Sequence, residues 1–202
     1  MFAKKRSYMD AHNWDANNPK ESTILTPIIL CNYIYEIIPR NFKRVFDIGC
    51  YDGNLSKPFK EHNYECIGID NQKIEYHNTF ILEDFLKMSN DSISIANDDL
   101  IVCNPPFNDK GRIYGRKLLP ELFLKKIVEL WGTKAQIVLI SPMGLRLNQK
   151  IKSSRWRWIR DNLEITSILS LPLDLFDKVK FHAEVIFFNI QEMKAHYFLN
   201  LP

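Results

Sequence analysis

Seven short apolar runs, rich in β-branched residues and bounded by turn residues, limit the folds open to this chain more than any other feature. Within each run apolar residues follow one another instead of alternating with polar ones, so both faces of each expected strand are covered, as in a largely parallel sheet. The runs are residues 44–49, 65–70, 79–84, 99–104, 135–141, 165–171 and 183–190.

Helix-like segments separate several of these runs, at 23–38, 55–62, 116–131 and 149–162. Strand and helix alternating in this way predict an open α/β domain. The alternation stops near the end, where the last two runs follow each other without a helix, which predicts an antiparallel hairpin at the sheet edge. We therefore expect a Rossmann-like fold with a mostly parallel, seven-stranded sheet and helices on both faces.

Length and composition indicate one globular domain. A chain of 202 residues, 46% hydrophobic and 25% charged, can bury a substantial core and is not a disordered composition. We expect this domain to span 21–202, behind a loosely ordered polar segment at 1–20. A net charge of +3 permits a polyanionic partner without requiring one.

The cysteines and the N-terminus bear on compartment. The four cysteines lie in or beside apolar runs, without the short spacings of metal or redox sites, which predicts reduced core thiols and no metal. The start of the chain lacks a signal-peptide pattern, and no apolar run is long enough to cross a bilayer. We expect a cytoplasmic protein with no membrane partner.

The first candidate site residues follow the run at 44–49, because ligands of open α/β sheets bind at the carboxyl ends of the strands. This run holds Asp47 and leads into a turn with Gly49, Cys50 and Gly53. Glycines allow a ligand to approach the backbone closely, and a helix start behind them favours polar groups. A plain tight turn explains this pattern equally well.

The next two run ends are also acidic. Asp70, followed by Asn71, ends the second run about 20 residues on, where a carboxylate can accept from both hydroxyls of a ribose. A helix cap is the simpler explanation of Asp70 alone. Asp84 ends the third run, and Phe85 follows it. The Asp84 carboxylate can accept from an adenine amino group, and the Phe85 side chain can cover a ring face. Together these ends favour a cofactor that contains a nucleoside.

The fourth run ends in Asn104-Pro105-Pro106-Phe107. Proline cannot donate to a sheet ladder and restricts the residue before it, so two prolines are a poor continuation of a strand. Asn-Pro-Pro-Phe after a buried run resembles the catalytic motif of the N6-adenine DNA methyltransferases, class I enzymes that use S-adenosylmethionine. The stretches "FDIGCYDG", "GID" and "EDF" come before it in the order of that family.

The resemblance extends over about residues 22–190. Upstream, "ILTPIILCNYIYEII", which contains Thr26 and Pro27, resembles the segment of this family in which a Thr-Pro precedes a helix and helps to hold the methionine part of the cofactor. Downstream, "AQIVLISP" and "FHAEVIFF" resemble the later strands that flank the target pocket. The residues that would then bind the cofactor are Thr26, Pro27, Asp47, Gly49, Cys50, Gly53, Asp70, Asn71, Asp84, Phe85 and Asn104.

The chemistry of an adenine amine explains why such a motif is useful. Its lone pair is delocalised into the ring, which makes it a poor nucleophile. The side-chain carbonyl of Asn104 and the backbone carbonyl of Pro105 can accept from the two amino hydrogens, which frees the lone pair for attack on a sulfonium methyl group. Pro106 holds the turn, and Phe107 is expected to stack on the extruded base. No metal or nucleophilic cysteine is required.

Basic residues in two stretches that follow the motif along the chain are candidate nucleic-acid contacts. They are Lys110, Arg112 and Arg116 after the motif, and Arg155 and Arg157 beside Trp156 and Trp158. A solvated helix face explains the second group equally well. The Phe and the upstream Thr-Pro favour adenine in DNA as the substrate, with an RNA base or a protein glutamine as the alternative.

Two departures from the family leave a third possibility open. Tyr51 stands where the cofactor turn of the family usually has its middle glycine. The chain also leaves no room for a separate target-recognition domain, so we expect a compact form that has relaxed specificity, relies on its own loops or relies on a protein partner. The alternative in which the chain is not an enzyme is a catalytically silent subunit, which binds nucleic acid or an active partner.

Overall fold

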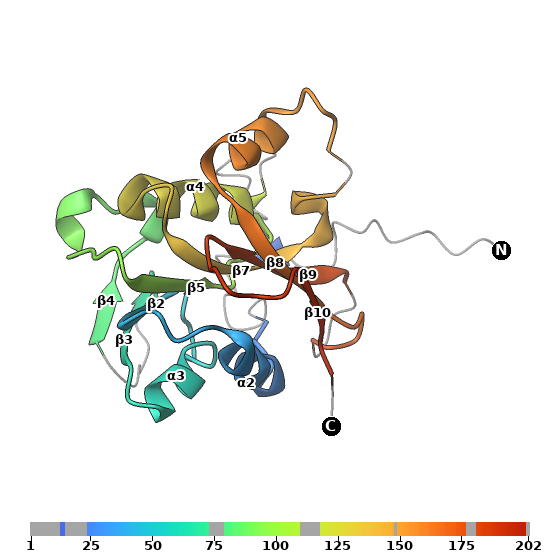
Figure 1. Cartoon of the computed structure of the whole chain (residues 1–202). Coiled ribbons are helices and arrows are strands. Elements are labelled where there is room, and N and C mark those ends of the chain that lie inside the picture. Colours follow the sequence, from blue (N-terminus) through green and yellow to red (C-terminus); the bar gives the residue numbers. More distant parts are fainter. Residues whose placement is uncertain are drawn as a thin grey trace.

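The computed structural model describes residues 13–14, 24–72, 79–109, 118–147, 149–176 and 181–200. Its centre is an eight-stranded sheet in the order β10-β8-β9-β7-β5-β2-β3-β4 (Figure 1). The strands are β2 Arg44–Ile48, β3 Glu65–Asp70, β4 Thr79–Leu82, β5 Asp99–Cys103, β7 Gln136–Pro142, β8 Ile165–Ser170, β9 Ala183–Phe188 and β10 His196–Phe198. Each of the seven runs singled out in the sequence overlaps one of these strands, and six contain their strand entirely, since β7 extends one residue past its run.

The sheet is mostly parallel, as predicted. Among the strands of the described residues, only β9 runs against its neighbours, β7 and β8. The predicted hairpin of β8 and β9 is therefore present, but it does not form the edge, because β10 adds an eighth strand parallel to β8. The strand His196–Phe198 has three residues with exposed ends, so it lacks the continuous apolar pattern that revealed the others.

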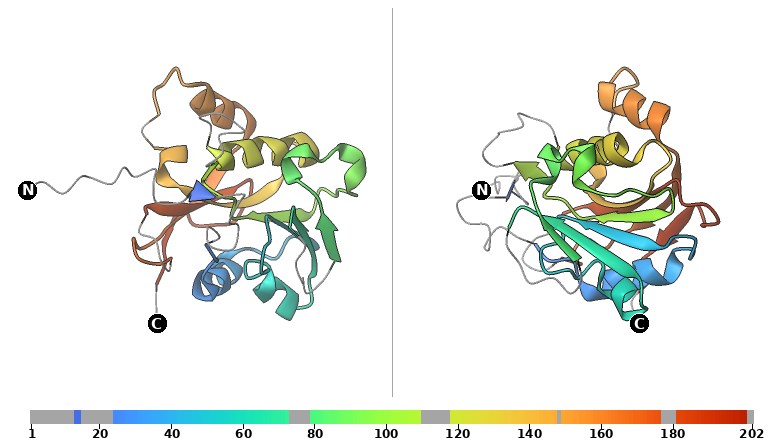
Figure 2. Two further views of the ribbon diagram at one scale, coloured as in Figure 1. Left: turned by 180° about the vertical axis from the view of Figure 1, so that it is seen from behind. Right: turned by 90° about the vertical axis from the view of Figure 1, so that its left-hand side faces the viewer.

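Among the described residues, helices lie on both faces of the sheet (Figure 2). The helices α2 (Ile28–Ile37) and α3 (Lys57–Glu61) lie on one face, and α4 (Leu119–Trp131) and α5 (Ser154–Asn162) on the other. Within the described residues, each predicted helical segment begins before its helix does. The residues before α2, α4 and α5 have extended backbone angles, and two of the four helices carry a proline in their first turn, where that residue is favoured.

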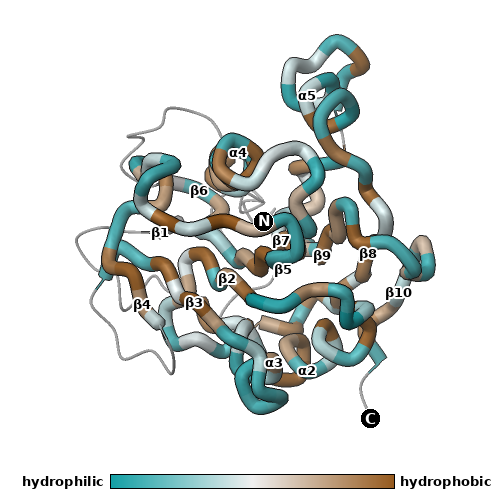
Figure 3. The backbone as a smooth tube through the Cα atoms, turned by 60° about the vertical axis from the view of Figure 1, so that its left-hand side comes forward, coloured by the Kyte–Doolittle hydropathy of each residue, from teal (hydrophilic) through white to brown (hydrophobic). Residues whose placement is uncertain are grey.

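The core consists of two apolar clusters, one on each face. Neighbouring residues of one strand enter opposite clusters: Val45 packs in the cluster under α2 and α3, and Phe46 in the cluster under α4. This alternation explains why the strands are continuously apolar, and Figure 3 shows hydrophobic residues along the central strands. The four cysteines are buried and unpaired, as predicted.

The expectation of a loosely ordered segment at 1–20 lies outside the described residues, apart from Asn13–Trp14. These two form the strand β1, which pairs in parallel with β6 (Asn108–Asp109), directly after the Asn-Pro-Pro-Phe motif. Within the described ranges, no helix combines the length and apolarity needed to span a bilayer.

Candidate active site

The predicted site residues gather at one edge of the sheet because their strands run parallel. Strands β3 and β5 both pair in parallel with β2, so that Ile48 aligns with Ile69 on one side and with Cys103 on the other. The turn after β2, Asp70 at the end of β3 and Asn104 after β5 therefore meet at this edge. Asp84 lies there too, because Asp70 pairs with the last residue of β4.

The turn after β2 owes its shape to left-handed backbone angles. Gly49 and Gly53 have φ of 69° and 74°, a region where a side chain is strained, and Tyr51 has φ of 41°. The N–H groups of Gly49 and Cys50 donate to the carbonyl of Ile69, at 2.8 and 3.3 Å, which ties the turn to β3. A Cβ added at Gly49 would meet no atom within 4 Å, so space is open beside the turn.

Asp47 braces this turn from inside. Its side chain is buried, and Oδ2 accepts from Oγ of Ser56 at 2.6 Å and from the backbone N–H of Ser56 at 3.2 Å. Burial raises the pKa of the Asp47 carboxyl to about 7, although the two hydrogen bonds from Ser56 lower it. The carboxyl links β2 to the residue that precedes α3, and its predicted role in cofactor binding stays a prediction.

The Asp70 carboxylate is hydrogen-bonded to the turn after β2. Its Oδ2 accepts from the backbone N–H of Tyr51 at 3.1 Å, and its Oδ1 from that of Gln72 at 2.9 Å. Burial raises the pKa of Asp70, while hydrogen bonds from the backbone of Gln72, Tyr51 and Asn71 lower it. Each oxygen of a carboxylate can accept more than one hydrogen bond, so Asp70 is held in place with acceptor capacity left.

Asp84 and Phe85 are placed differently from each other. Asp84 caps the short 3-10 helix at Phe85–Lys87, accepting from the N–H of Leu86 at 3.2 Å, and pairs with Lys87 at 3.0 Å. The Phe85 side chain is buried, with its ring 5.4 Å from that of Phe123 on α4. Its predicted contact with a ligand ring stays a prediction, and such a contact requires neighbouring side chains to move.

The centre of the site is a hydrogen bond between segments 78 residues apart. Nδ2 of Asn104 donates to Oγ1 of Thr26 at 2.9 Å. Thr26 is buried and lies just before α2, and its backbone carbonyl accepts from Nδ2 of Asn54 at 3.3 Å. Sequence reasoning found Thr26 and Asn104 but missed Asn54, whose only signal is its place directly after Gly53.

The rest of the motif is buried to different degrees. Pro105 is buried and Pro106 is half-buried. The Phe107 side chain is 4% exposed, and its ring stands at 85° to that of Phe181 with 4.9 Å between centroids. The predicted stacking of Phe107 on a base stays a prediction, and it requires a neighbouring side chain to move aside.

Comparison of the sequence with protein-family models and with curated proteins finds no match. Solved structures do match. The modification subunit of a putative type I restriction enzyme from Vibrio vulnificus aligns over 92% of this chain and 49% of its own, with a TM-score of 0.66 at 16% identity. A putative class I S-adenosylmethionine-dependent methyltransferase from Listeria monocytogenes aligns over 91% of this chain and 66% of its own, with a TM-score of 0.58 at 14% identity. The chain has the class I methyltransferase fold.

A second type I restriction-modification protein, the methyltransferase subunit from Streptococcus thermophilus, shares this fold. It aligns over 87% of this chain and 47% of its own, with a TM-score of 0.61 at 15% identity. The chain spans about half the length of the two restriction-modification subunits.

The structure describes two of the five candidate nucleic-acid contacts, Arg155 and Arg157. Lys110, Arg112 and Arg116 lie outside the described residues. Arg155 is half-buried: its Nε donates to Oε2 of Glu121 at 2.6 Å, and its Nη1 to the carbonyl of Gly144 at 3.3 Å. Arg157 is exposed, two residues further along α5. Arg157 is therefore better placed than Arg155 for a phosphate contact.

One buried ion pair at the site edge was missed. Nη2 of Arg146 lies 2.7 Å from Oε2 of Glu184, and Nε lies 3.2 Å from Oε1. Glu184 is buried near the start of β9 and pairs with Ser141 near the end of β7. A charged residue inside the apolar run "AEVIFF" is the signal that predicts such a partner, because a buried charge is unstable alone.

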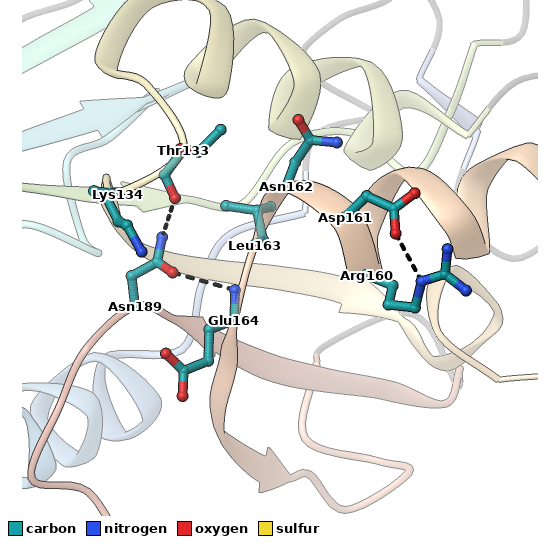
Figure 4. A pocket seen from close by; sticks show the side chains of 8 residues that line it. All are labelled: Thr133, Lys134, Arg160, Asp161, Asn162, Leu163, Glu164 and Asn189. Carbon is teal, nitrogen blue, oxygen red and sulfur yellow. Dashed lines mark hydrogen bonds and ion pairs between the residues drawn. The ribbon is translucent and has the colours of Figure 1, made fainter.

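A polar pocket of about 240 Å³ lies at the opposite edge of the methyltransferase fold (Figure 4). It lies between the ends of α4 and α5, where the Asn189 side chain braces the neighbouring backbone. The amide of Asn189 donates to the carbonyl of Thr133 at 3.0 Å and accepts from the N–H of Glu164 at 3.2 Å. Because it lies at the amino ends of β7 and β8, it is separate from the candidate site.

Proposed function

We propose that this chain transfers a methyl group from S-adenosylmethionine to the exocyclic N6 amine of adenine in DNA. The observation that carries the proposal is the position of Asn104. It directly follows strand β5 of a class I methyltransferase fold, beside the turn after β2, and its amide donates a hydrogen bond to Thr26. Asn-Pro-Pro-Phe in that position supplies two carbonyl acceptors for an amine.

The residues around the turn fit such a cofactor. S-adenosylmethionine would supply a methyl group on a positively charged sulfur, open to attack by a nitrogen lone pair. Asp70, held by two backbone N–H groups, would accept from the ribose hydroxyls. The open space beside Gly49 would admit the ligand next to the backbone, and Asp84 would accept from the adenine amino group of the cofactor.

The chain's own part in the reaction is to bind and orient the target amine. Oδ1 of Asn104 and the carbonyl of Pro105 would accept its two hydrogens, which favours a tetrahedral nitrogen with an available lone pair. As positive charge develops on that nitrogen, the same two dipoles stabilise it. Side chains fixed before the substrate arrives need little rearrangement during the transfer, and the bond between Asn104 and Thr26 is such a restraint.

The names of the structural neighbours support DNA as the substrate and a protein as the partner. Two are subunits of type I restriction-modification systems, one named for modification and one as the methyltransferase. We propose by analogy that a partner supplies target recognition to this chain. The exposed Arg157 on α5 supports a contact with the nucleic-acid backbone.

The test offers labelled S-adenosylmethionine with unmethylated DNA, RNA and protein in parallel, followed by nucleoside and amino-acid analysis. We expect N6-methyladenine in DNA. Asn104→Ala should lower the transfer rate at least about 100-fold, the typical cost of losing one preorganised polar group at a reacting centre, with cofactor binding preserved. Asn162→Ala is the matched control, because that amide donates to Trp158 on α5, away from the site. Label found only in RNA or protein would overturn the DNA assignment in favour of an RNA-base or glutamine methyltransferase.

Tyr51 favours one other candidate, a catalytically silent subunit. Its φ of 41° shows that the turn keeps a left-handed angle although the side chain is not glycine, and this side chain stands at the cofactor turn. Calorimetric titration with S-adenosylmethionine separates the candidates. A folded wild-type chain that shows no binding heat and no thermal stabilisation would favour the silent subunit.

A further inference from the structure

The amide of Asn104 has two unlike ends, and only one suits an amine. Its oxygen accepts hydrogen bonds, whereas its nitrogen donates them and would oppose the hydrogens of the target. The terminal torsion of an asparagine is broad, so a free side chain samples many orientations. In the structure the nitrogen is engaged: it donates to Oγ1 of Thr26 at 2.9 Å.

Thr26 is itself rigidly held. Its side chain is 6% exposed, so water competes little for the hydroxyl and the bond is stronger than on the surface. Its backbone carbonyl accepts from Nδ2 of Asn54 at 3.3 Å. Pro27, which follows, accepts from the N–H groups of Leu30 and Cys31 in the first turn of α2, at 2.9 and 3.2 Å. The hydroxyl thus extends from an anchored helix start.

We propose that Thr26 is a positioning residue for methyl transfer, acting through Asn104. Its hydroxyl holds the amide nitrogen, so that Oδ1 is presented to the target amine before the substrate arrives. This role rests on the proposed function and differs from the contact with the cofactor that the sequence resemblance implies. It predicts that loss of the hydroxyl slows the transfer step and leaves cofactor affinity unchanged.

The experiment compares three variants with the wild-type chain. Thr26→Val keeps the shape of the side chain and removes the hydroxyl, whereas Thr26→Ser keeps the hydroxyl. Thr166→Val is the matched control, because the Thr166 hydroxyl donates to the backbone of Phe187 at 3.2 Å at the far end of β8. Calorimetry gives the dissociation constant of S-adenosylmethionine, and single-turnover assays at saturating cofactor and DNA give the transfer rate.

We expect Thr26→Val to slow single-turnover transfer by about 10- to 100-fold, because a small misplacement of a reacting group has effects of that size. Its dissociation constant for S-adenosylmethionine should stay within about twofold of the wild-type value, because the substitution removes no contact with the bound cofactor. Thr26→Ser and Thr166→Val should transfer at close to the wild-type rate. An unchanged rate in Thr26→Val, or a weaker cofactor affinity with an unchanged saturated rate, would overturn the proposal.

A measurement on the cofactor-free protein tests the contact without activity. The side-chain amide of Asn104 gives a ¹H–¹⁵N signal, assigned by its absence in Asn104→Ala. Its protons should exchange with solvent faster in Thr26→Val than in the wild-type chain and in Thr166→Val. Equal exchange would overturn the contact. A wild-type chain that transfers no methyl group would instead overturn the proposed function, while the exchange rates would still decide whether Thr26 holds Asn104.

Discussion

Arg155 and Arg157 lie two residues apart on α5, yet the structure predicts opposite consequences of losing them. The Arg155 guanidinium pairs with Glu121 at 2.6 Å, and the Glu121 side chain is only 7% exposed. The other oxygen of Glu121 accepts from Lys125 at 2.8 Å. Arg157 is exposed. Arg155→Ala should therefore destabilise the fold, and Arg157→Ala should weaken DNA binding with the fold intact.

The size of the effect follows from what remains around Glu121. Removing one partner of a fully buried ion pair costs about 3–5 kcal/mol, because an uncompensated charge stays buried. Here Lys125 still compensates part of the charge, and its own side chain is 34% exposed. We therefore expect Arg155→Ala to lower the free energy of unfolding by about 2 kcal/mol, or Tm by about 4–8 °C for a chain of this size.

The pH dependence gives this prediction a second signature. Burial raises the pKa of Glu121, but hydrogen bonds from Lys125 and Arg155 outweigh it, and the pKa lies below its ordinary value. A carboxyl whose pKa is lowered by folding stabilises the fold at pH values above its ordinary pKa. This contribution is lost as the pH falls through the lowered pKa. The difference in unfolding free energy between wild type and Arg155→Ala should thus be larger at pH 7 than at about pH 4.

Denaturant unfolding at both pH values measures the differences in free energy, thermal unfolding measures Tm, and Arg157→Ala is the control. Arg157→Ala should leave Tm within about 2 °C of the wild-type value, as is usual for an exposed residue. Its affinity for DNA should fall, and the slope of log affinity against log salt should decrease by about one. Equal Tm values for the two variants, or a deficit in Arg155→Ala that does not shrink in acid, would refute the reasoning.

Three further predictions concern the strands and the turn. Asp99→Ala should lower the free energy of unfolding in urea by about 3 kcal/mol, because the buried Asp99 carboxylate accepts from both ends of the Arg44 guanidinium fork. Asp98→Ala should have little effect, because the Asp98 side chain is 36% exposed and that of its partner Lys43 is 81% exposed. Tyr51→Gly should bind S-adenosylmethionine at least as tightly as the wild type, as measured by calorimetry. The hydrogen bond from Tyr51 to Asp70 comes from the backbone N–H, which glycine keeps. Weaker binding would contradict this prediction. Burial raises the pKa of the Asp47 carboxyl to about 7. Its contribution to stability is therefore present at about pH 4 and is lost as pH rises through about 7, by at most about 4 kcal/mol. Asp47→Asn should remove this pH dependence from the free energy of unfolding measured in urea.

The strands and the order of the site residues were predictable from the sequence. Continuous apolar runs indicate burial on both faces, and each of the seven runs overlaps a strand of the sheet. Since parallel strands end at one edge, Asp70, Asp84 and Asn104 were expected to lie near one another, and they do. The starts of the helices and the eighth strand, β10, were not predictable, because extended residues before a helix and a three-residue edge strand have no strong periodicity.

The partners of individual side chains depend on the tertiary structure. Nothing in the sequence pairs Thr26 with Asn104, and nothing distinguishes Arg155 from Arg157, although one is held by a buried glutamate and the other is exposed. The Phe107 ring, expected against a base, packs on Phe181. Periodicity reflects whether a residue is buried, which is a local property of the chain. Which atoms meet depends on how the sheet order and the helices bring distant segments together.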